Sequence, residues 1–273
     1  MTDNSVPSLT KPGASIPQTG DQLAIEQRGP VLWLTITREE RRNAISPAVV
    51  GGMCQAITAA QGRRDIRAIV VTGTGTKAFC AGADLQSANT FVTDYSEPHG
   101  QLAQLLRVVK ASCVPLIARV NGACMAGGMG LLSMCDMAVA ARHAVFGLPE
   151  VKVGVFPAQV LTVLQHLIPR RVLSEMCLTG EPITSAQALE YKLVNYVDDD
   201  VDVRLQWLLD RLLDKSPAAV RRGLYTMKTV ENMAFEESMS FTESQIALFT
   251  LTEDAREGKA AFQEKRKPNW TGQ

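Results

Sequence analysis

Apolar stretches of strand length alternate with longer amphipathic stretches in the first part of the chain. The stretches expected to form strands are residues 22–27, 31–37, 66–72, 115–120 and 137–140. Helices are expected between them at residues 47–61, 100–111 and 131–136. The first two strands should form an antiparallel hairpin around Arg28–Pro30. Because the stretch 66–72 is apolar almost throughout, its strand should be covered on both faces. The alternation predicts an α/β fold with a parallel sheet and right-handed crossovers.

Beyond Pro157 the pattern becomes almost entirely helical. Helices are expected at residues 158–167, 171–178, 185–191, 200–214, 217–232, 235–251 and 253–262. Those at 217–232 and 235–251 carry Leu, Met, Val, Ile or Phe on more than one face, and such faces imply a partner surface in water. At the other end, the first twenty residues are rich in Pro, Ser, Thr, Gly and Asn and are expected to be a disordered tail.

The amino-acid composition argues against several classes of function. Lys and Arg total 28 and so do Asp and Glu, so no basic field is available to attract nucleic acid or an anionic membrane. No apolar run approaches the roughly 20 residues that span a bilayer. The six cysteines lie mostly within apolar runs without paired spacing, which is typical of free thiols in the cytoplasm. The three histidines are scattered, so we expect no metal site.

Two turns rich in small residues carry the candidate chemistry. One is Phe79–Leu85, with the sequence FCAGADL, and the other is Asn121–Gly130, with the sequence NGACMAGGMG. A strand that feeds a glycine turn opening a helix leaves backbone N–H groups free to bind phosphate, carboxylate or a developing oxyanion. The alternative is that the glycines merely allow tight strand–helix packing. The presence of a second turn of the same kind favours the chemical interpretation.

These motifs resemble those of the crotonase family, the enoyl-CoA hydratase/isomerase superfamily. The resemblance rests on the two turns, on Cys135-Asp136, on the segment FGLPE at residues 146–150 and on the segment EGKAAFQEKRK at residues 257–267. It covers residues 22–270 in order and implies a crotonase-like spiral of ββα units with a helical C-terminal oligomerisation region. The implied organisation is a tail at residues 1–20, an α/β core with the CoA and acyl site at 21–200, and a helical region for trimerisation at 201–273.

The resemblance also implies roles for individual residues. The backbone amides of Ala83 and Gly127 would stabilise the negative charge on the oxygen of a CoA thioester, which is part of the substrate rather than a separate cofactor. Residues implied in contacts with the acyl-CoA are Arg41, Ala44, Ala81, Gly82, Ala83, Asp84, Leu85, Met125, Gly127 and Pro149. Phe262 and Lys265 would reach the CoA site of a neighbouring subunit in a homotrimer or a dimer of trimers. For Lys265, the alternative is a solvated basic tail.

The sequence departs from the two-glutamate members of the family at one position. Gly130 stands where the first glutamate would be, so Glu150 is the one carboxylate that the motifs retain. Asp94 or Glu97 is a candidate for a second acid. Val155–Val160 replaces a glycine-rich turn, so the acyl pocket is expected to be lined by Phe156, Gln159, Met125 and Met129. We therefore expect an enoyl-CoA hydratase-like enzyme with a single glutamate acid/base, with an enoyl-CoA delta-isomerase and a non-catalytic acyl-CoA-binding protein as the alternatives.

Overall fold

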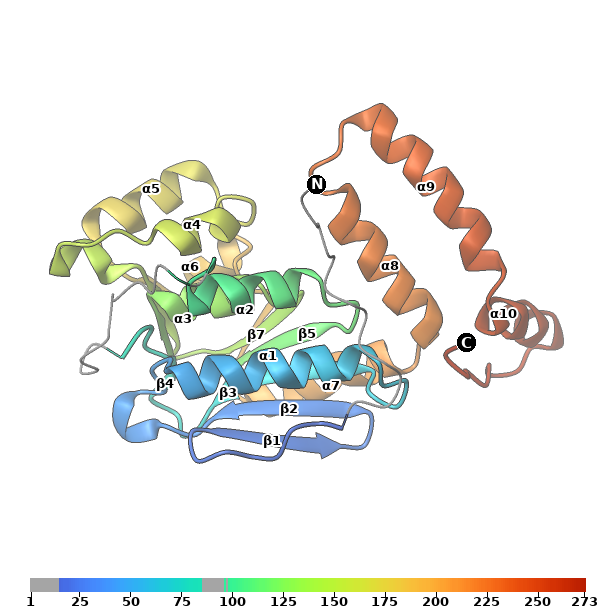
Figure 1. The fold of residues 1–273 in the computed structure, drawn as a ribbon, viewed down its shortest axis with the longest axis horizontal. Helices are drawn as coiled ribbons and strands as arrows, with labels where there is room; N and C mark the ends of the chain where they lie inside the picture. The colour runs from blue at the N-terminus through green and yellow to red at the C-terminus, as the bar shows by residue number, and fades with distance from the viewer. Residues whose placement is uncertain (1–14, 85–95, 97) are drawn as a thin grey trace.

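Two β-sheets form the centre of the protein, and the chain visits them in turn (Figure 1). The computed structural model describes residues 15–84, 96 and 98–273. The larger sheet has the order β1 (Leu23–Arg28), β2 (Val31–Ile36), β3 (Ala68–Gly73), β5 (Leu116–Val120), β7 (Met137–Ala141) and β10 (Tyr196–Asp198). The smaller sheet has the order β4 (Ala78–Cys80), β6 (Ala123–Met125), β8 (Val145–Gly147) and β9 (Ile183–Thr184).

The chain builds these sheets from a repeated ββα unit. Strands β3, β5 and β7 enter the larger sheet, and the strand that follows each of them enters the smaller one. Helices α2 (Gln101–Lys110) and α3 (Gly127–Ser133) close the first two units. Because β2, β3, β5, β7 and β10 pair in parallel while β1 and β2 pair antiparallel, both the parallel sheet and the initial hairpin are confirmed. The expected spiral of ββα units is likewise confirmed.

Helices cover both faces of the larger sheet. Helix α1 (Pro47–Gln61) begins at the expected residue, where the Ser46 side chain accepts a hydrogen bond from the Val49 amide. It packs on one face as part of the main core. Helix α7 (Val201–Leu213) packs on the opposite face through apolar side chains such as Leu205. Every residue of β3 is consequently buried, as its apolar sequence predicts.

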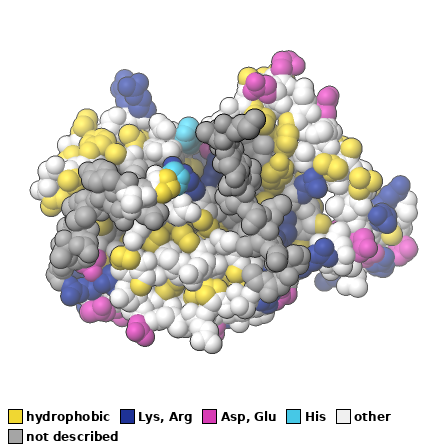
Figure 2. Space-filling view, viewed as in Figure 1, with side chains coloured by type: hydrophobic (Ala, Val, Ile, Leu, Met, Phe, Trp, Pro, Cys, Tyr) yellow, Lys and Arg dark blue, Asp and Glu magenta, His cyan; other side chains and the backbone are white. Residues whose placement is uncertain are grey.

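The last helices leave the sheets and form an arm, seen at the right of Figure 1. The arm consists of α8 (Pro217–Val230), α9 (Phe235–Thr250) and α10 (Glu253–Glu264). Helix α8 is fixed to the core by two cations. Lys228 pairs with Asp136 at 3.1 Å, and Arg221 donates to carbonyl groups at the C-terminal end of α1. Apolar side chains are exposed along α8 and α9, among them Tyr225, Met227, Phe235, Met239, Ile246 and Leu248 (Figure 2).

Several elements differ from the sequence-based expectation. Helix α3 begins at Gly127 rather than at 131, so the helix starts inside the glycine turn. Strand β6 lies within a segment interpreted as a turn, β4 overlaps the start of the other, and β8, β9 and β10 were not predicted. These strands are two or three residues long, too short for a period-2 pattern, and their existence depends on pairing with neighbours distant in sequence. The remaining helices are α4 (Ala158–Leu164), α5 (Arg170–Thr179), α6 (Ser185–Glu190) and the 3-10 helices η1 (Glu39–Arg41) and η2 (Pro149–Val153).

Candidate active site

The candidate site lies at the ends of three parallel strands of the smaller sheet. Strand β4 pairs with β6, and β6 pairs with β8, all in the same direction. Their carboxyl ends therefore lie at one edge of the sheet, where ligands bind in open parallel sheets. The segments that leave this edge are Ala81–Asp84 after β4, Ala126–Gly127 after β6 and Leu148–Glu150 after β8. The expected donors and the expected carboxylate thus emerge from neighbouring strand ends.

The first two of these segments are in direct contact. Gly82 has a φ of +92°, and a Cβ placed there would lie 2.7 Å from the Ala126 Cβ and 3.0 Å from the Gly127 amide nitrogen. A side chain at Gly82 would therefore clash with the second turn, in addition to straining its own backbone. A Cβ placed on Gly127 would lie 3.7 Å from the amide nitrogen of Ala83. The structure brings the two expected oxyanion donors together.

Backbone geometry leaves both amides available. Ala83 forms a parallel bridge with Ile45, in which Gly82 O accepts from Ile45 N at 2.7 Å and Asp84 N donates to Ile45 O at 3.3 Å. The amide of Ala83 between them points away from this bridge. Gly127 is the first residue of α3, where no intrahelical acceptor exists for the amide. Neither amide donates a hydrogen bond to another of the described residues.

The residue before Gly127 stores strain. Ala126 has φ 51° and ψ −122°, a conformation that side chains with a Cβ rarely adopt. Such strain costs of order 1–3 kcal/mol and persists where the surrounding structure enforces it. Here it turns the chain sharply from β6 into α3, and this turn sets the direction of the Gly127 amide.

The loop that carries Ala83 is tied to the segment Arg41–Ala44, which contains two of the residues implied in contacts with the acyl-CoA and is called the CoA turn below. The Ala81 amide donates to Arg42 O at 3.1 Å. Asp84 forms an ion pair with Arg38 at 2.7 Å, with both side chains largely buried, and Arg38 also donates to Ala44 O at 2.7 Å. The segment from Arg41 to Ala44 therefore lies against the segment from Ala81 to Asp84. The resemblance assigned both segments to the CoA site, but the sequence did not identify Arg38 as the link between them.

Glu150 lies in a partly apolar environment. It follows Pro149 at the start of η2, and its Oε2 atom is buried without a hydrogen-bond partner among the described residues. Burial raises the pKa of Glu150, and a hydrogen bond from its own backbone amide opposes this shift. Burial also raises the pKa of the Cys177 thiol, to which the charge of Glu150 adds. A carboxyl group with a raised pKa and an oxygen without a hydrogen-bond partner among the described residues is suited to proton transfer.

The atoms nearest to Gly130 on α3 belong to aliphatic side chains. A Cβ at this position would lie 3.3 Å from Val160 Cγ2 on α4 and 3.9 Å from Leu106 Cδ2 on α2. The room that a longer side chain would need is occupied by aliphatic atoms. The space beside Gly130 is therefore occupied by Val160 of α4. The sequence did not single out Val160 as a residue of the site.

Other predicted residues lie in different surroundings. Met129 is fully buried in the main core, whereas Met125 is partly buried with its sulfur beside Gly147. Phe156 and Gln159 are exposed at the start of α4. Leu85, Asp94 and Glu97 lie outside the described residues. A cavity of about 210 Å³ between α1 and the N-terminal segment contains none of the predicted site residues.

Phe262 and Lys265 are distant from the site of their own chain. Both lie at the end of α10, at the far right of Figure 1, whereas β4 lies at the left. The Phe262 side chain is 86% exposed, an unusual state for a large aromatic residue. The described residues include no group of three or more His, Cys, Asp or Glu side chains placed to hold a metal ion. No helix within the described part of the chain is long and apolar enough to cross a membrane.

Comparison with known proteins identifies consistent relatives. A family model described as enoyl-CoA hydratase/isomerase matches residues 26–273. The enoyl-CoA hydratase EchA19 of Mycobacterium tuberculosis is 34% identical over 93% of this chain and 97% of its own length. The 2,3-dehydroadipyl-CoA hydratase of Escherichia coli is 31% identical over 92% of this chain and 99% of its own. The crystal structure of an enoyl-CoA hydratase from Bacillus anthracis superposes with a TM-score of 0.86 at 26% identity, covering 92% of this chain and all of that one.

Proposed function

The chain belongs to the enoyl-CoA hydratase/isomerase family, and from this premise we propose that it hydrates a 2-enoyl-CoA thioester with Glu150 as its acid/base. The amides of Ala83 and Gly127 would bind the thioester oxygen. The printed names of relatives include hydratases of chemically different acyl groups, such as 2,3-dehydroadipyl-CoA and crotonyl-CoA. The proposal therefore concerns the reaction and leaves the acyl group open.

The proposed reaction adds water across the C2–C3 double bond. Glu150 removes a proton from water as the oxygen bonds to C3, and the electron pair of the double bond moves into the thioester to give an enolate. The two amides stabilise the charge on the enolate oxygen, and one such donor contributes about 2.7–4 kcal/mol. Glu150 then returns the proton to C2. The product is the 3-hydroxyacyl-CoA, and no further cofactor takes part.

The observation that carries this proposal is the convergence at one sheet edge. The amides of Ala83 and Gly127 are free of acceptors among the described residues, and a Cβ on Gly127 would come within 3.7 Å of the Ala83 nitrogen. Glu150 leaves the next strand of the same sheet with an unpartnered buried oxygen. An acyl-CoA-binding protein without activity would need neither the acid nor the paired donors.

A second candidate is the isomerisation of 3-enoyl-CoA to 2-enoyl-CoA. It is favoured by the aliphatic contact between Gly130 and Val160, because a wall of this kind provides no group to hold water. In this reaction Glu150 would take a proton from C2, giving a conjugated dienolate, and return the proton to C4. The oxyanion donors would serve both reactions equally.

We also propose the binding arrangement that the resemblance implies. CoA would lie along Arg41–Ala44 and Ala81–Leu85, with Met125 and Pro149 near the acyl end. Phe262 and Lys265 would contact the CoA of a neighbouring subunit in a homotrimer or a dimer of trimers. Support comes from the exposure of Phe262 and of the apolar side chains on α8 and α9. Residues 21–200 would then form the catalytic core and 201–273 the assembly region, and the six free cysteines support a cytoplasmic location.

Labelled water separates the two candidate reactions. The purified protein is incubated with 2-enoyl-CoA or 3-enoyl-CoA thioesters in H₂¹⁸O, and the products are measured by mass spectrometry. Hydration gives a 3-hydroxyacyl-CoA carrying ¹⁸O, whereas isomerisation moves the double bond without gaining oxygen. No change in any thioester over a range of chain lengths and branching would contradict both reactions.

A further inference from the structure

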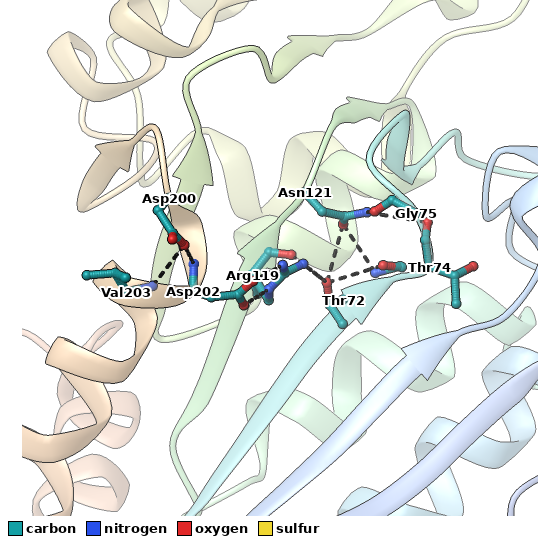
Figure 3. A network of polar contacts seen from close by, with 9 residues as sticks. Thr72, Thr74, Gly75, Arg119, Asn121, Asp200, Asp202 and Val203 are labelled. Atoms are coloured by element: carbon teal, nitrogen blue, oxygen red, sulfur yellow. Dashed lines mark hydrogen bonds and ion pairs between the residues drawn. The ribbon is translucent and has the colours of Figure 1, made fainter.

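Asn121 lies at the junction between β5 and β6 and is almost fully buried. Its Nδ2 donates to the carbonyl oxygens of Gly75 at 2.8 Å and Ala78 at 3.1 Å. Its Oδ1 accepts from the Gly73 amide and the Thr72 hydroxyl, both at 3.3 Å. Figure 3 shows this side chain facing the turn between β3 and β4. Asn121 therefore holds the turn from which β4 starts, together with Asn43, whose Nδ2 donates to Thr74 O at 3.0 Å and Ala78 O at 2.7 Å.

Asn121 connects the two backbone segments that lead to the proposed oxyanion donors. Along its own chain, Asn121 leads through β6 to Gly127. Across the sheet, it holds Ala78, the first residue of β4, and β4 leads directly to Ala83. A shift of β4 along β6 would move the Ala83 amide relative to the Gly127 amide.

The ladder between β4 and β6 does little to prevent such a shift. It consists of the pairs Ala78 with Ala123 and Cys80 with Cys124, and the register changes between them. Two residues of β4 thus oppose one residue of β6, as in a β-bulge, where pairing is locally disrupted. In a ladder this short the register must be fixed by other contacts.

Asn121 and its neighbour Gly122 contribute to this fixation from the β6 side, and Asn43 contributes from the other side. A Cβ on Gly122 would lie 2.5 Å from the carbonyl carbon of Lys77, so the junction and the turn meet backbone to backbone. The backbone that carries Asn121 is itself anchored, because Arg119 makes a two-bond ion pair with Asp202 on α7 at 2.6 and 2.7 Å (Figure 3). The side-chain amide of Asn121 therefore connects the junction between β5 and β6 to the turn before β4.

We propose that Asn121 is a positioning residue that sets the separation of the Ala83 and Gly127 amides and thereby the strength of the oxyanion hole. The inference rests on the proposed function and makes that function depend on a residue that does not touch the substrate. Loss of its hydrogen bonds allows β4 to move against β6, and a displacement near 1 Å at a catalytic group can lower turnover by about 10²-fold. CoA binding depends on other contacts and should change little.

The test measures carbonyl polarisation directly. An enoyl-CoA with an extended conjugated acyl group absorbs at longer wavelength when its thioester oxygen accepts hydrogen bonds. We would titrate the wild type, Asn121→Ala and Asn121→Asp with such a thioester, recording its dissociation constant, the absorption shift at saturation, kcat and KM. Asn121→Asp has nearly the same shape and keeps the acceptor for Gly73 but loses the donors to the turn, so it serves if the alanine variant does not fold.

The matched control is Ser112→Ala. Ser112 is buried near the start of β5, and its hydroxyl bonds with Gln61 and with both backbone groups of Val114. Removing it should lower Tm in the same way as the loss of other buried hydrogen bonds, without changing the absorption shift or kcat. It thus separates a general loss of stability from a change at the oxyanion hole.

The outcomes are distinct. The expected result for the Asn121 variants is a smaller absorption shift and a kcat lowered by about 10–10²-fold, with KM and the dissociation constant within about threefold of the wild type. A full absorption shift in a folded Asn121 variant would overturn the positioning role alone. If the wild type bound the thioester without any shift, the oxyanion hole would be absent and the proposed function would fail with it.

Discussion

Replacing Glu150 by glutamine should impair activity while leaving the fold equally or more stable. Glutamine has nearly the same shape but cannot exchange the proton. Removal of one general acid/base lowers turnover by about 10²–10⁴-fold, which corresponds to about 2.7–5.5 kcal/mol of activation free energy. Substrate binding should change little, because the proposed CoA contacts lie on the backbone turns. Both effects are measured by steady-state kinetics on the preferred thioester.

The expected gain in stability follows from the loss of a charge, because Glu150 Oε2 is buried without a partner among the described residues and glutamine places an uncharged atom there. A buried group without a partner costs more when it is charged than when it is neutral, and partial exposure of the residue to solvent limits this difference to about 1 kcal/mol. For a chain of this size, about 1 kcal/mol corresponds to a rise of about 2–4 °C in Tm. The variant Glu190→Gln, on the exposed side of α6, is the matched control and should change neither activity nor Tm.

The gain should depend on pH with a defined sign. Because burial raises the pKa of Glu150 above its ordinary value, the folded protein binds this proton more tightly than the unfolded chain does. The wild type is therefore unaffected below the ordinary pKa and loses stability as pH rises through the raised pKa. The Tm difference between the glutamine variant and the wild type should be largest at neutral pH and shrink as pH falls toward 4.5, the ordinary value. A glutamine variant with kcat within about threefold of the wild type would refute the assignment of Glu150 as the acid/base.

Three further predictions concern the glycine positions and the arm. Gly127→Val should lower kcat by about 10²–10³-fold, the usual loss on removing an oxyanion donor, and should change Tm only modestly because the nearest side-chain atom lies 3.4 Å from the added Cβ. The control Gly51→Ala, at an open position of α1, should keep full activity. An active valine variant would mean that the oxyanion hole lies elsewhere. Gly130→Glu alone should lose about 1–3 kcal/mol of stability through crowding against Val160, and adding Val160→Ala should restore Tm in a melting experiment. If water activation limits hydration, the double variant should incorporate ¹⁸O faster, and an unchanged rate in a folded double variant would show that it does not. Phe262→Ala should raise KM by about tenfold or less with kcat unchanged if the ring contacts a neighbour's CoA, and sedimentation of a stable monomer at micromolar concentration would contradict both this role and the trimer.

Much of the fold was predictable because its elements are encoded locally. Helix α1 begins and ends at the expected residues, since Ser46 caps it and Pro47 fits its first turn. The continuous apolar sequence of β3 correctly indicated a strand covered on both faces. The helices of the second half likewise lie within a few residues of the predicted ranges, because their apolar periodicity extends over several turns.

The smaller sheet was not predictable in the same way. Its strands β4, β6, β8 and β9 contain two or three residues each, and their hydrogen bonds go to partners far away in sequence. No local pattern distinguishes such a strand from a turn. Yet this sheet is what places the Ala83 and Gly127 amides and Glu150 at one edge.

For the candidate site, the sequence by itself determined which groups are available. The two small-residue turns, the loss of a carboxylate at Gly130 and the retention of Glu150 can all be identified without coordinates. The tertiary structure alone decided that Val160 fills the space beside Gly130, that Arg38 ties Asp84 to the CoA turn, and that Asn121 holds the base of β4. These side chains act through contacts with residues 30 to 46 positions away in the chain, and a pattern of local spacing carries no information about such contacts.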